Sequence, residues 1–133
     1  MKKTILSIAI ALVTIITTNA QSKESKTTNV TFGVRGNCGM CKATIEGAIK
    51  ELKGVTKVNW DVDNKKIDIT YDDFQTNLME LHTAIANSGY DTDMSKGNDT
   101  AYENLASCCQ YDRKMKMSLN PKKEDHSHSG HKH

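Results

Sequence analysis

The chain is poor in proline, in aromatic side chains and in net charge. Its 133 residues include a single proline, Pro121, and a single tryptophan, Trp60, and aromatic residues make up only 5%. One proline near the C-terminus excludes a proline-rich or collagen-like protein. The formal net charge of +2 provides no basic patch of the kind that binds nucleic acid, so we expect no nucleic-acid partner.

Long apolar runs are absent after the first twenty residues. Lys2 and Lys3 precede an apolar run over residues 5–16 and a small-residue end that closes with Ala20. This order predicts a secretory signal peptide over residues 1–20, cut after Ala20. The run is shorter than the roughly 20 residues that span a bilayer. We therefore expect no membrane insertion after signal cleavage, and a periplasmic protein.

Hydrophobic periodicity predicts one small α+β domain over residues 29–95. Apolar residues alternate with polar ones, as in half-buried strands, over residues 30–34, 58–62, 67–71 and the short piece 90–94. They recur with helical spacing over residues 41–52 and 78–88. The order strand, helix, strand, strand, helix, strand predicts a ferredoxin-like βαββαβ sandwich, with both helices covering one face of the sheet.

The segments between and around these elements are polar. We expect a flexible stretch at residues 21–28, and a hairpin turn at residues 63–65 in which Asn64 takes a positive φ. Over residues 96–113 the sequence predicts a linker followed by a short helix, which begins with a capping box at residues 100–103. Over residues 114–133 it predicts a disordered, His-rich tail.

Two cysteines three positions apart carry the first chemical signal. Cys38 and Cys41, in the stretch "RGNCGMCKATIE", fall where the first strand ends and the first helix begins. Free backbone N–H groups and the helix dipole favour anionic sulfur at such a position. Two thiolates on a loop suit a soft ion such as Cu(I), with Ag(I) and Hg(II) as chemical relatives. Structural Zn(II) prefers four ligands, so it would need further groups.

These residues, together with the predicted element order, resemble the heavy-metal-associated domain family. That family includes copper chaperones, periplasmic mercury-binding proteins and modules of heavy-metal P-type ATPases. The resemblance implies that Cys38 and Cys41 bind the metal and that Tyr90, after "AIANSG", lies beside the metal loop. It also implies a monomer that is not an enzyme and that passes its ion by ligand exchange to a transport or efflux protein with exposed thiolates.

The loop departs from the family pattern, usually written Gly-Met-x-Cys-x-x-Cys. Gly36 stands only two residues before Cys38, no methionine precedes the pair, and Met40 lies between the cysteines instead. Met40 either turns inward to replace the missing core packing, which we favour, or presents its thioether to the metal.

A thiol–disulfide exchange protein is the alternative function for the same pair, because oxidoreductases also place Cys-x-x-Cys at a helix start. The folded region lacks the proline that a resemblance to thioredoxins would require, which counts against this alternative. A disulfide without any metal is a third interpretation in an oxidising compartment.

A second pair, Cys108 and Cys109, has three open interpretations. On the predicted short helix, Cys109 can pack as a small hydrophobic side chain beside Tyr102 and Leu105. The pair can instead form a structural disulfide, or fold back toward the first loop as auxiliary metal ligands. The sequence does not choose among these.

Five histidines complete the set of metal-binding side chains. His126, His128, His131 and His133 cluster in the tail, where imidazoles on a flexible chain can wrap Cu(II), Ni(II) or Zn(II). They are either auxiliary metal ligands or part of a solvated tail. His82 lies on the apolar stripe of the second helix, so we interpret it as a rim or core histidine and not as a ligand. The sequence as a whole predicts a periplasmic metallochaperone that carries one soft ion, with Cu(I) favoured.

Overall fold

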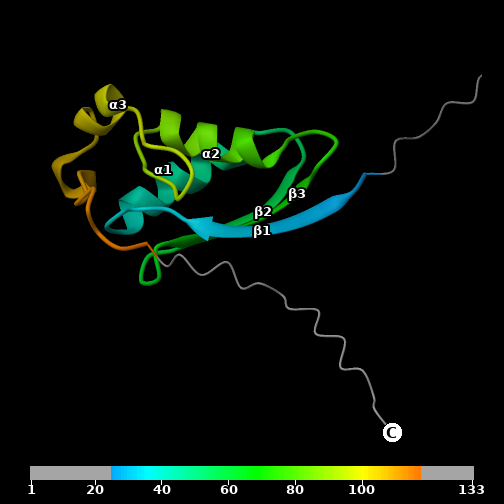
Figure 1. Cartoon of the computed structure of the whole chain (residues 1–133), viewed down its shortest axis with the longest axis horizontal. Helices are drawn as coiled ribbons and strands as arrows, with labels where there is room; N and C mark the ends of the chain where they lie inside the picture. The colour runs from blue at the N-terminus through cyan, green and yellow to red at the C-terminus, as the bar shows by residue number, and fades with distance from the viewer. Residues whose placement is uncertain (1–24, 118–133) are drawn as a thin grey trace, which may run out of the picture.

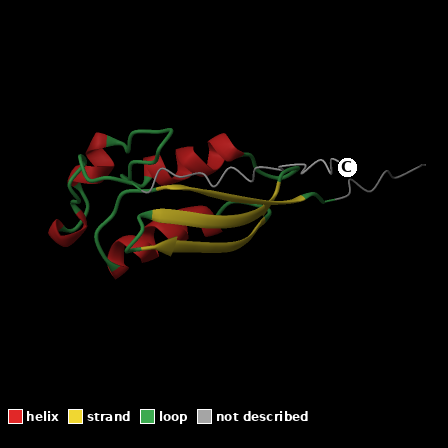
Figure 2. Ribbon diagram, turned by 60° about the horizontal axis from the view of Figure 1, so that its bottom comes forward, coloured by secondary structure: helices red, strands yellow, loops and turns green. Residues whose placement is uncertain are grey.

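The computed structural model describes residues 25–117. The predicted signal peptide and the histidines at 126, 128, 131 and 133 lie outside the described residues. Within that range, β1 (Thr27–Gly33), β2 (Val55–Asp61) and β3 (Lys66–Asp72) form an antiparallel sheet in the order β1-β3-β2 (Figures 1 and 2). Phe32 and Trp60 both pair with Ile67 across the central strand, so apolar side chains line up across one face of the sheet.

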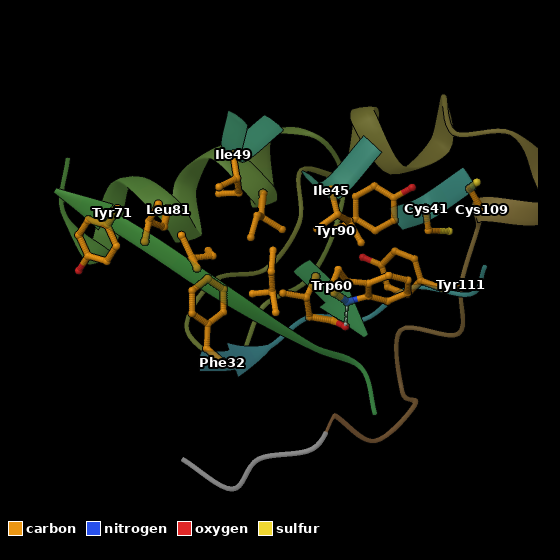
Figure 3. Packing of buried hydrophobic residues seen from close by; sticks show 14 residues of the cluster. Phe32, Cys41, Ile45, Ile49, Trp60, Tyr71, Leu81, Tyr90, Cys109 and Tyr111 are labelled. Carbon is orange, nitrogen blue, oxygen red and sulfur yellow. Dashed lines mark hydrogen bonds between the residues drawn. The ribbon is translucent and has the colours of Figure 1, made fainter. Parts of the chain in front are cut away.

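Two helices, α1 (Gly39–Lys50) and α2 (Leu78–Asn87), lie together on that face (Figure 1). Each contributes the apolar stripe that the sequence predicts. The fully buried apolar side chains of the two helices are Cys41, Ile45, Ile49, Leu81 and Ile85, and they pack on the strand residues shown in Figure 3. This arrangement confirms the α+β ferredoxin-like fold, with one helical layer over one antiparallel sheet.

The prediction of a fourth strand over residues 90–94 is wrong. This segment forms only a single bridge, between Val34 and Thr92. The backbone turns back at this point, because Thr92 N–H donates to the Ser95 carbonyl at 2.8 Å and the Thr92 hydroxyl accepts from Ser95 N–H at 2.9 Å. The bridge keeps only the bonds from Arg35 N–H to the Asp91 carbonyl and from Asp93 N–H to the Gly33 carbonyl, because the turn at residues 92–95 directs the chain away from β1 directly afterwards.

Two local details also differ from expectation. In the hairpin the positive φ, 53°, belongs to Lys65, whereas Asn64 donates its backbone and side-chain N–H groups to the Asp61 carboxylate. The third helix, α3 (Asp99–Glu103), is capped by Asn98, whose side chain accepts from Ala101 N–H at 2.9 Å. The predicted cap at Thr100 is therefore wrong, because Asn98 two residues earlier supplies the N-terminal acceptor.

Residues 98–117, here called the C-terminal arm, pack against the end of the domain where β1 stops and α1 starts (Figure 1). The arm contains α3 and a short 3₁₀ helix, Ser107–Cys109. The sequence predicts one helix that carries both Tyr102 and Cys109, but the two residues lie on different helices. Along residues 25–117, none of the helices has the length and hydropathy of a membrane span.

Candidate metal centre

The loop that precedes α1 is fixed by hydrogen bonds to three distant segments. Val34 N–H donates to the Lys65 carbonyl and Arg35 N–H to the Asp91 carbonyl, both at 2.9 Å. The Val34 carbonyl accepts from the Trp60 indole N–H at 3.1 Å. These bonds connect the loop to the hairpin, to the segment after α2 and to the core, so the cysteines start from a rigid base.

Gly36 is required where the loop passes over Trp60. A Cβ atom at this position would lie 2.9 Å from two atoms of the Trp60 ring and 3.3 Å from the Cys41 Cβ. The indole thus occupies space beneath the loop and brings the backbone close to the core. Sequence reasoning did not assign this supporting role to Trp60, because it depends on a contact across the fold.

Cys38 is the N-cap residue of α1, and Cys41 lies in the first turn of that helix. The Cys41 side chain is fully buried, and its sulfur accepts a hydrogen bond from Asn37 N–H at 3.3 Å. Burial acts to raise the pKa of the Cys41 thiol, but hydrogen bonds from the N–H groups of Asn37 and Cys38, together with the Tyr90 and Cys109 side chains, outweigh it and hold the pKa below its ordinary value. The thiolate form of Cys41 is therefore favoured relative to an ordinary cysteine.

Tyr90 lies beside this site. Its ring is fully buried and its hydroxyl points toward Cys41 and Cys109 (Figure 3). Among the described residues this hydroxyl has no partner with regular hydrogen-bond geometry, although it is close enough to help lower the pKa of Cys41. Burial, followed by the nearby Cys41 sulfur, raises the pKa of Tyr90 far above its ordinary value, so the phenol stays neutral.

Met40 does not pack in the core. Its side chain is 58% exposed, and its sulfur lies 3.6 Å from the Cys108 sulfur. The interpretation that Met40 replaces missing core packing is therefore wrong, since it is the second residue of α1 and points outward. The structure instead places its thioether at the rim of the thiol site.

The second thiol pair comes back to the first. The sulfurs of Cys38, Cys108 and Cys109 all lie within 4.8 Å of one another, and those of Cys108 and Cys109 are 3.9 Å apart. Cys41 lies deeper and is not among these three, but its thiol and that of Cys109 perturb each other. Burial, followed by the neighbouring Cys41 sulfur, raises the pKa of Cys109 to about 12.

The remaining cysteines and His82 can also be located within the described residues. All four cysteines are free thiols at one end of the domain. Cys109 also packs in the core, as the hydrophobic interpretation expected, whereas Cys108 is exposed. His82 is 1% exposed and lies far from solvent, with its Nδ1 2.7 Å from the Thr92 hydroxyl, so it is a core histidine and not one at the rim.

Comparison with known proteins agrees with this architecture. The family model "Heavy-metal-associated domain" matches residues 32–91. The "Mercuric transport protein periplasmic component" of Serratia marcescens is 34% identical over 97 residues, which cover 72% of this chain and 100% of that protein. "Copper chaperone CopZ" of Staphylococcus aureus (strain JH9) is 33% identical over 55 residues, covering 41% of this chain and 81% of that one.

A solved structure shows the same fold. A proposed copper-ion-binding protein from Bacillus anthracis superimposes with a TM-score of 0.50 at 30% identity, covering 52% of this chain and 99% of that chain. The family model, a relative matched over its whole length and the sheet with its helical layer all agree. The chain belongs to the heavy-metal-associated domain family.

Proposed function

We propose that this protein is a periplasmic metallochaperone that captures one soft metal ion at Cys38 and Cys41 and passes it to a partner by ligand exchange. Cu(I) is the favoured cargo, and Ag(I) and Hg(II) compete for the same donors. The ion is cargo, and the protein performs no covalent reaction on it. The partner is a metal-transport or efflux protein that presents its own thiolates.

The carrying observation is the position of the two thiols at the start of α1. Cys38 caps the helix without using its side chain as a cap, so the sulfur is free to bind an ion. Cys41 accepts the Asn37 N–H at 3.3 Å, which favours its thiolate. One accessible and one inner sulfur make a site that can take up an ion from outside and exchange ligands with an incoming thiolate.

The choice of Cu(I) depends on chemistry rather than on the relatives, whose names include both mercury and copper. Thiolate and thioether sulfurs are soft donors, and Cu(I) accepts two or three of them. The exposed Met40 thioether near the site adds a donor that suits copper. The predicted signal peptide and the periplasmic relative of Serratia marcescens support the location.

A competitive Cu(I) titration tests this function. We would compare reduced protein, residues 21–133, with a Cys38→Ser/Cys41→Ser variant and with Ser107→Ala as an exposed control. The double variant should lose more than the roughly 100-fold in affinity that removal of a supporting residue costs, because the ligands themselves are gone. The Ser107→Ala variant should bind as wild type does.

Equal affinity of wild type and the double variant would overturn the proposed site. Formation of a stable mixed disulfide by a Cys41→Ser variant, with unchanged Cu(I) affinity, would favour thiol–disulfide exchange instead. The two functions therefore give opposite results with the same set of proteins.

A further inference from the structure

The C-terminal arm lies outside residues 32–91, the part that matches the family model, yet it returns to the metal loop. The Asn37 side chain donates to the Cys108 carbonyl at 3.1 Å, directly beside Cys38. The Met40 and Cys108 sulfurs are 3.6 Å apart. The arm thus touches the loop through the residues on either side of Cys38.

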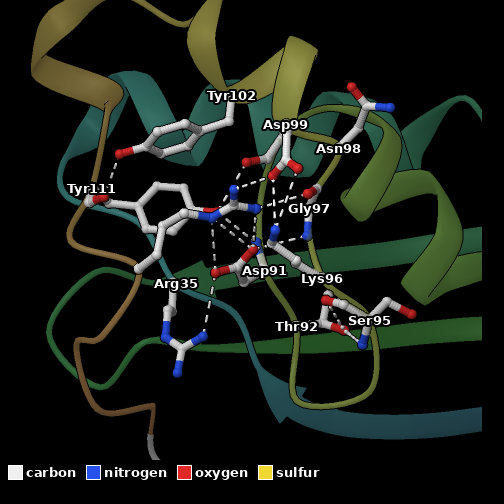
Figure 4. Close-up of polar contacts among 12 residues, drawn as sticks. Arg35, Asp91, Thr92, Ser95, Lys96, Gly97, Asn98, Asp99, Tyr102 and Tyr111 are labelled. Carbon is white, nitrogen blue, oxygen red and sulfur yellow. Dashed lines mark hydrogen bonds and ion pairs between the residues drawn. The ribbon is translucent and has the colours of Figure 1, made fainter.

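A polar clasp holds the arm in this position (Figure 4). The Arg113 guanidinium donates to the Asp91 carboxylate and to the Gly97 carbonyl, each at 2.7 Å, and also pairs with Asp99. Arg35 approaches the same carboxylate at 3.3 Å and donates to the Met115 carbonyl at 2.7 Å. The Asp91 side chain is only 5% exposed, so these charged hydrogen bonds form in a largely desolvated place.

Aromatic packing continues the clasp toward the thiols. The Tyr111 ring stacks on Tyr90 with centroids 5.6 Å apart and meets the edge of Tyr102 at 5.1 Å. The Tyr111 hydroxyl accepts from Asp91 N–H at 2.8 Å and donates to the Gly89 carbonyl at 2.9 Å. Cys109, two residues before Tyr111, is thereby fixed next to the first thiol pair and is buried.

The sulfur positions fit one ion with more than two ligands. Three sulfurs around an ion at about 2.3 Å lie about 4 Å from one another. Cys108 and Cys109 are already 3.9 Å apart, and both lie within 4.8 Å of Cys38. Closure onto an ion needs shifts of under about 1 Å, which exposed Cys108 and the loop residue Cys38 can make by small side-chain rotations.

We propose that Cys108 and Cys109 bind the captured ion together with Cys38, so that the ion is bound by at least three sulfurs and Cys38 is shared between the two pairs. This inference rests on the proposed function. Each thiol that binds releases its proton to solvent, and no redox change is involved. The arm is then part of the metal site and not a tether.

The arrangement also suggests the order of ligand exchange. Cys108 is exposed, whereas Cys41 and Cys109 are buried. A partner thiolate can therefore displace Cys108 first and leave the inner sulfurs in place until the ion has gained a new ligand. A third thiolate also disfavours loss of the ion to water and slows its release.

Thiol protection in wild-type protein tests the inference without any substitution. Metal-free protein and protein with one equivalent of Cu(I) would be treated with an alkylating reagent, and each cysteine followed by mass spectrometry. Exposed Cys108 should react quickly in the metal-free protein and at least tenfold more slowly with the ion. Equal Cys108 rates in both states, with Cys38 protected, would overturn the inference and leave the proposed function intact.

Copper X-ray absorption supplies the second measurement. Wild type and the Ser107→Ala control should show three or more sulfur ligands, whereas Cys108→Ser/Cys109→Ala should retain its ion with two. Alanine keeps a small apolar side chain in the buried Cys109 position, so the variant is expected to fold. Two sulfurs in wild type, or three in the double variant, would contradict the inference. Loss of binding in Cys38→Ser/Cys41→Ser tests only the proposed function.

Discussion

The two thiol pairs look alike in burial but differ in electrostatics. Each has one accessible and one buried sulfur: Cys41 is 0% exposed and Cys109 is 3% exposed. Yet the pKa of Cys41 is lowered, whereas that of Cys109 is raised to about 12. Burial acts to raise the pKa in both cases. Hydrogen bonds, first from the backbone N–H groups of Asn37 and Cys38 before α1, reverse its effect only for Cys41, so hydrogen-bond donors decide which of the two buried thiols has the lower pKa.

The pairs also differ in how they are held. Cys38 and Cys41 belong to a helix start whose loop is bonded to the backbone of the hairpin, to the backbone after α2 and to the Trp60 indole. Cys108 and Cys109 lie on a 3₁₀ helix that depends on side chains, chiefly Arg113 with Asp91 and the tyrosine stack. The first pair is built into the secondary structure, whereas the second is docked onto it. Substitutions should be able to disturb one pair and spare the other.

The largest effect is expected from Arg113→Met, which removes the clasp and leaves Asp91 largely buried with Arg35 as its remaining cationic partner. Hydrogen bonds to charged groups contribute about 1.5–3 kcal/mol each, so we expect a loss of about 2–3 kcal/mol in the free energy of unfolding. Cys109 should become accessible to alkylation, while Cys41 stays protected. Urea unfolding and site-resolved alkylation check both statements.

Exposed Lys114 provides the control, because Lys114→Met removes a neighbouring positive charge without touching Asp91.

The stability that the clasp provides also depends on pH. Burial acts to raise the pKa of Asp91, but hydrogen bonds from Arg113 and Gly97 outweigh it and hold the pKa below its ordinary value. The stabilisation is thus complete above about pH 4 and is lost on further acidification. A wild-type advantage over Arg113→Met that persists unchanged at lower pH would contradict this account.

A smaller effect is expected at the first pair from Gly36→Ala. The added methyl group would meet the Trp60 ring at 2.9 Å, so the loop or the indole must shift, at a cost of about 1–3 kcal/mol. Gly39→Ala is the matched control, because no atom lies within 4 Å of its added Cβ. It should be neutral or slightly stabilising. Equal urea midpoints for the two variants would show that Trp60 does not support the loop.

Local sequence signals predicted those parts of the molecule that depend on local periodicity. The apolar stripes of α1 and α2 and the alternation of β1, β2 and β3 each follow from spacing within one element. The direction of the pKa shift of Cys41 agrees with its position at a helix start, although its causes are the N–H groups of Asn37 and Cys38 just before the helix and the side chains of Tyr90 and Cys109. The helical stripe likewise predicts a rim or core position for His82, and its burial places it in the core.

Features that depend on contacts between distant segments were not predictable in this way. The 90–94 strand shortens to one bridge because Thr92 and Ser95 close a local turn. The clasp joins Asp91 to Arg113, 22 residues away, across a linker-like stretch. One signal was nevertheless present: among the 18 basic residues only Arg35 and Arg113 are arginines, and both bind Asp91. Arginine where lysine dominates favours a multidentate carboxylate contact.

The smallest change in the free energy of unfolding is expected from the two stacked tyrosines, Tyr90 and Tyr111, which lie between the thiol pairs. The Tyr111 hydroxyl bonds to Asp91 N–H and to the Gly89 carbonyl, whereas the Tyr90 hydroxyl has no regular partner among the described residues. Tyr111→Phe leaves buried backbone groups unpaired and should cost about 1–2 kcal/mol, but Tyr90→Phe should change the free energy of unfolding by less than about 0.5 kcal/mol. Urea unfolding of metal-free proteins measures both. An equal cost at Tyr90 would mean that its hydroxyl forms a true hydrogen bond with a cysteine sulfur in the metal-free protein.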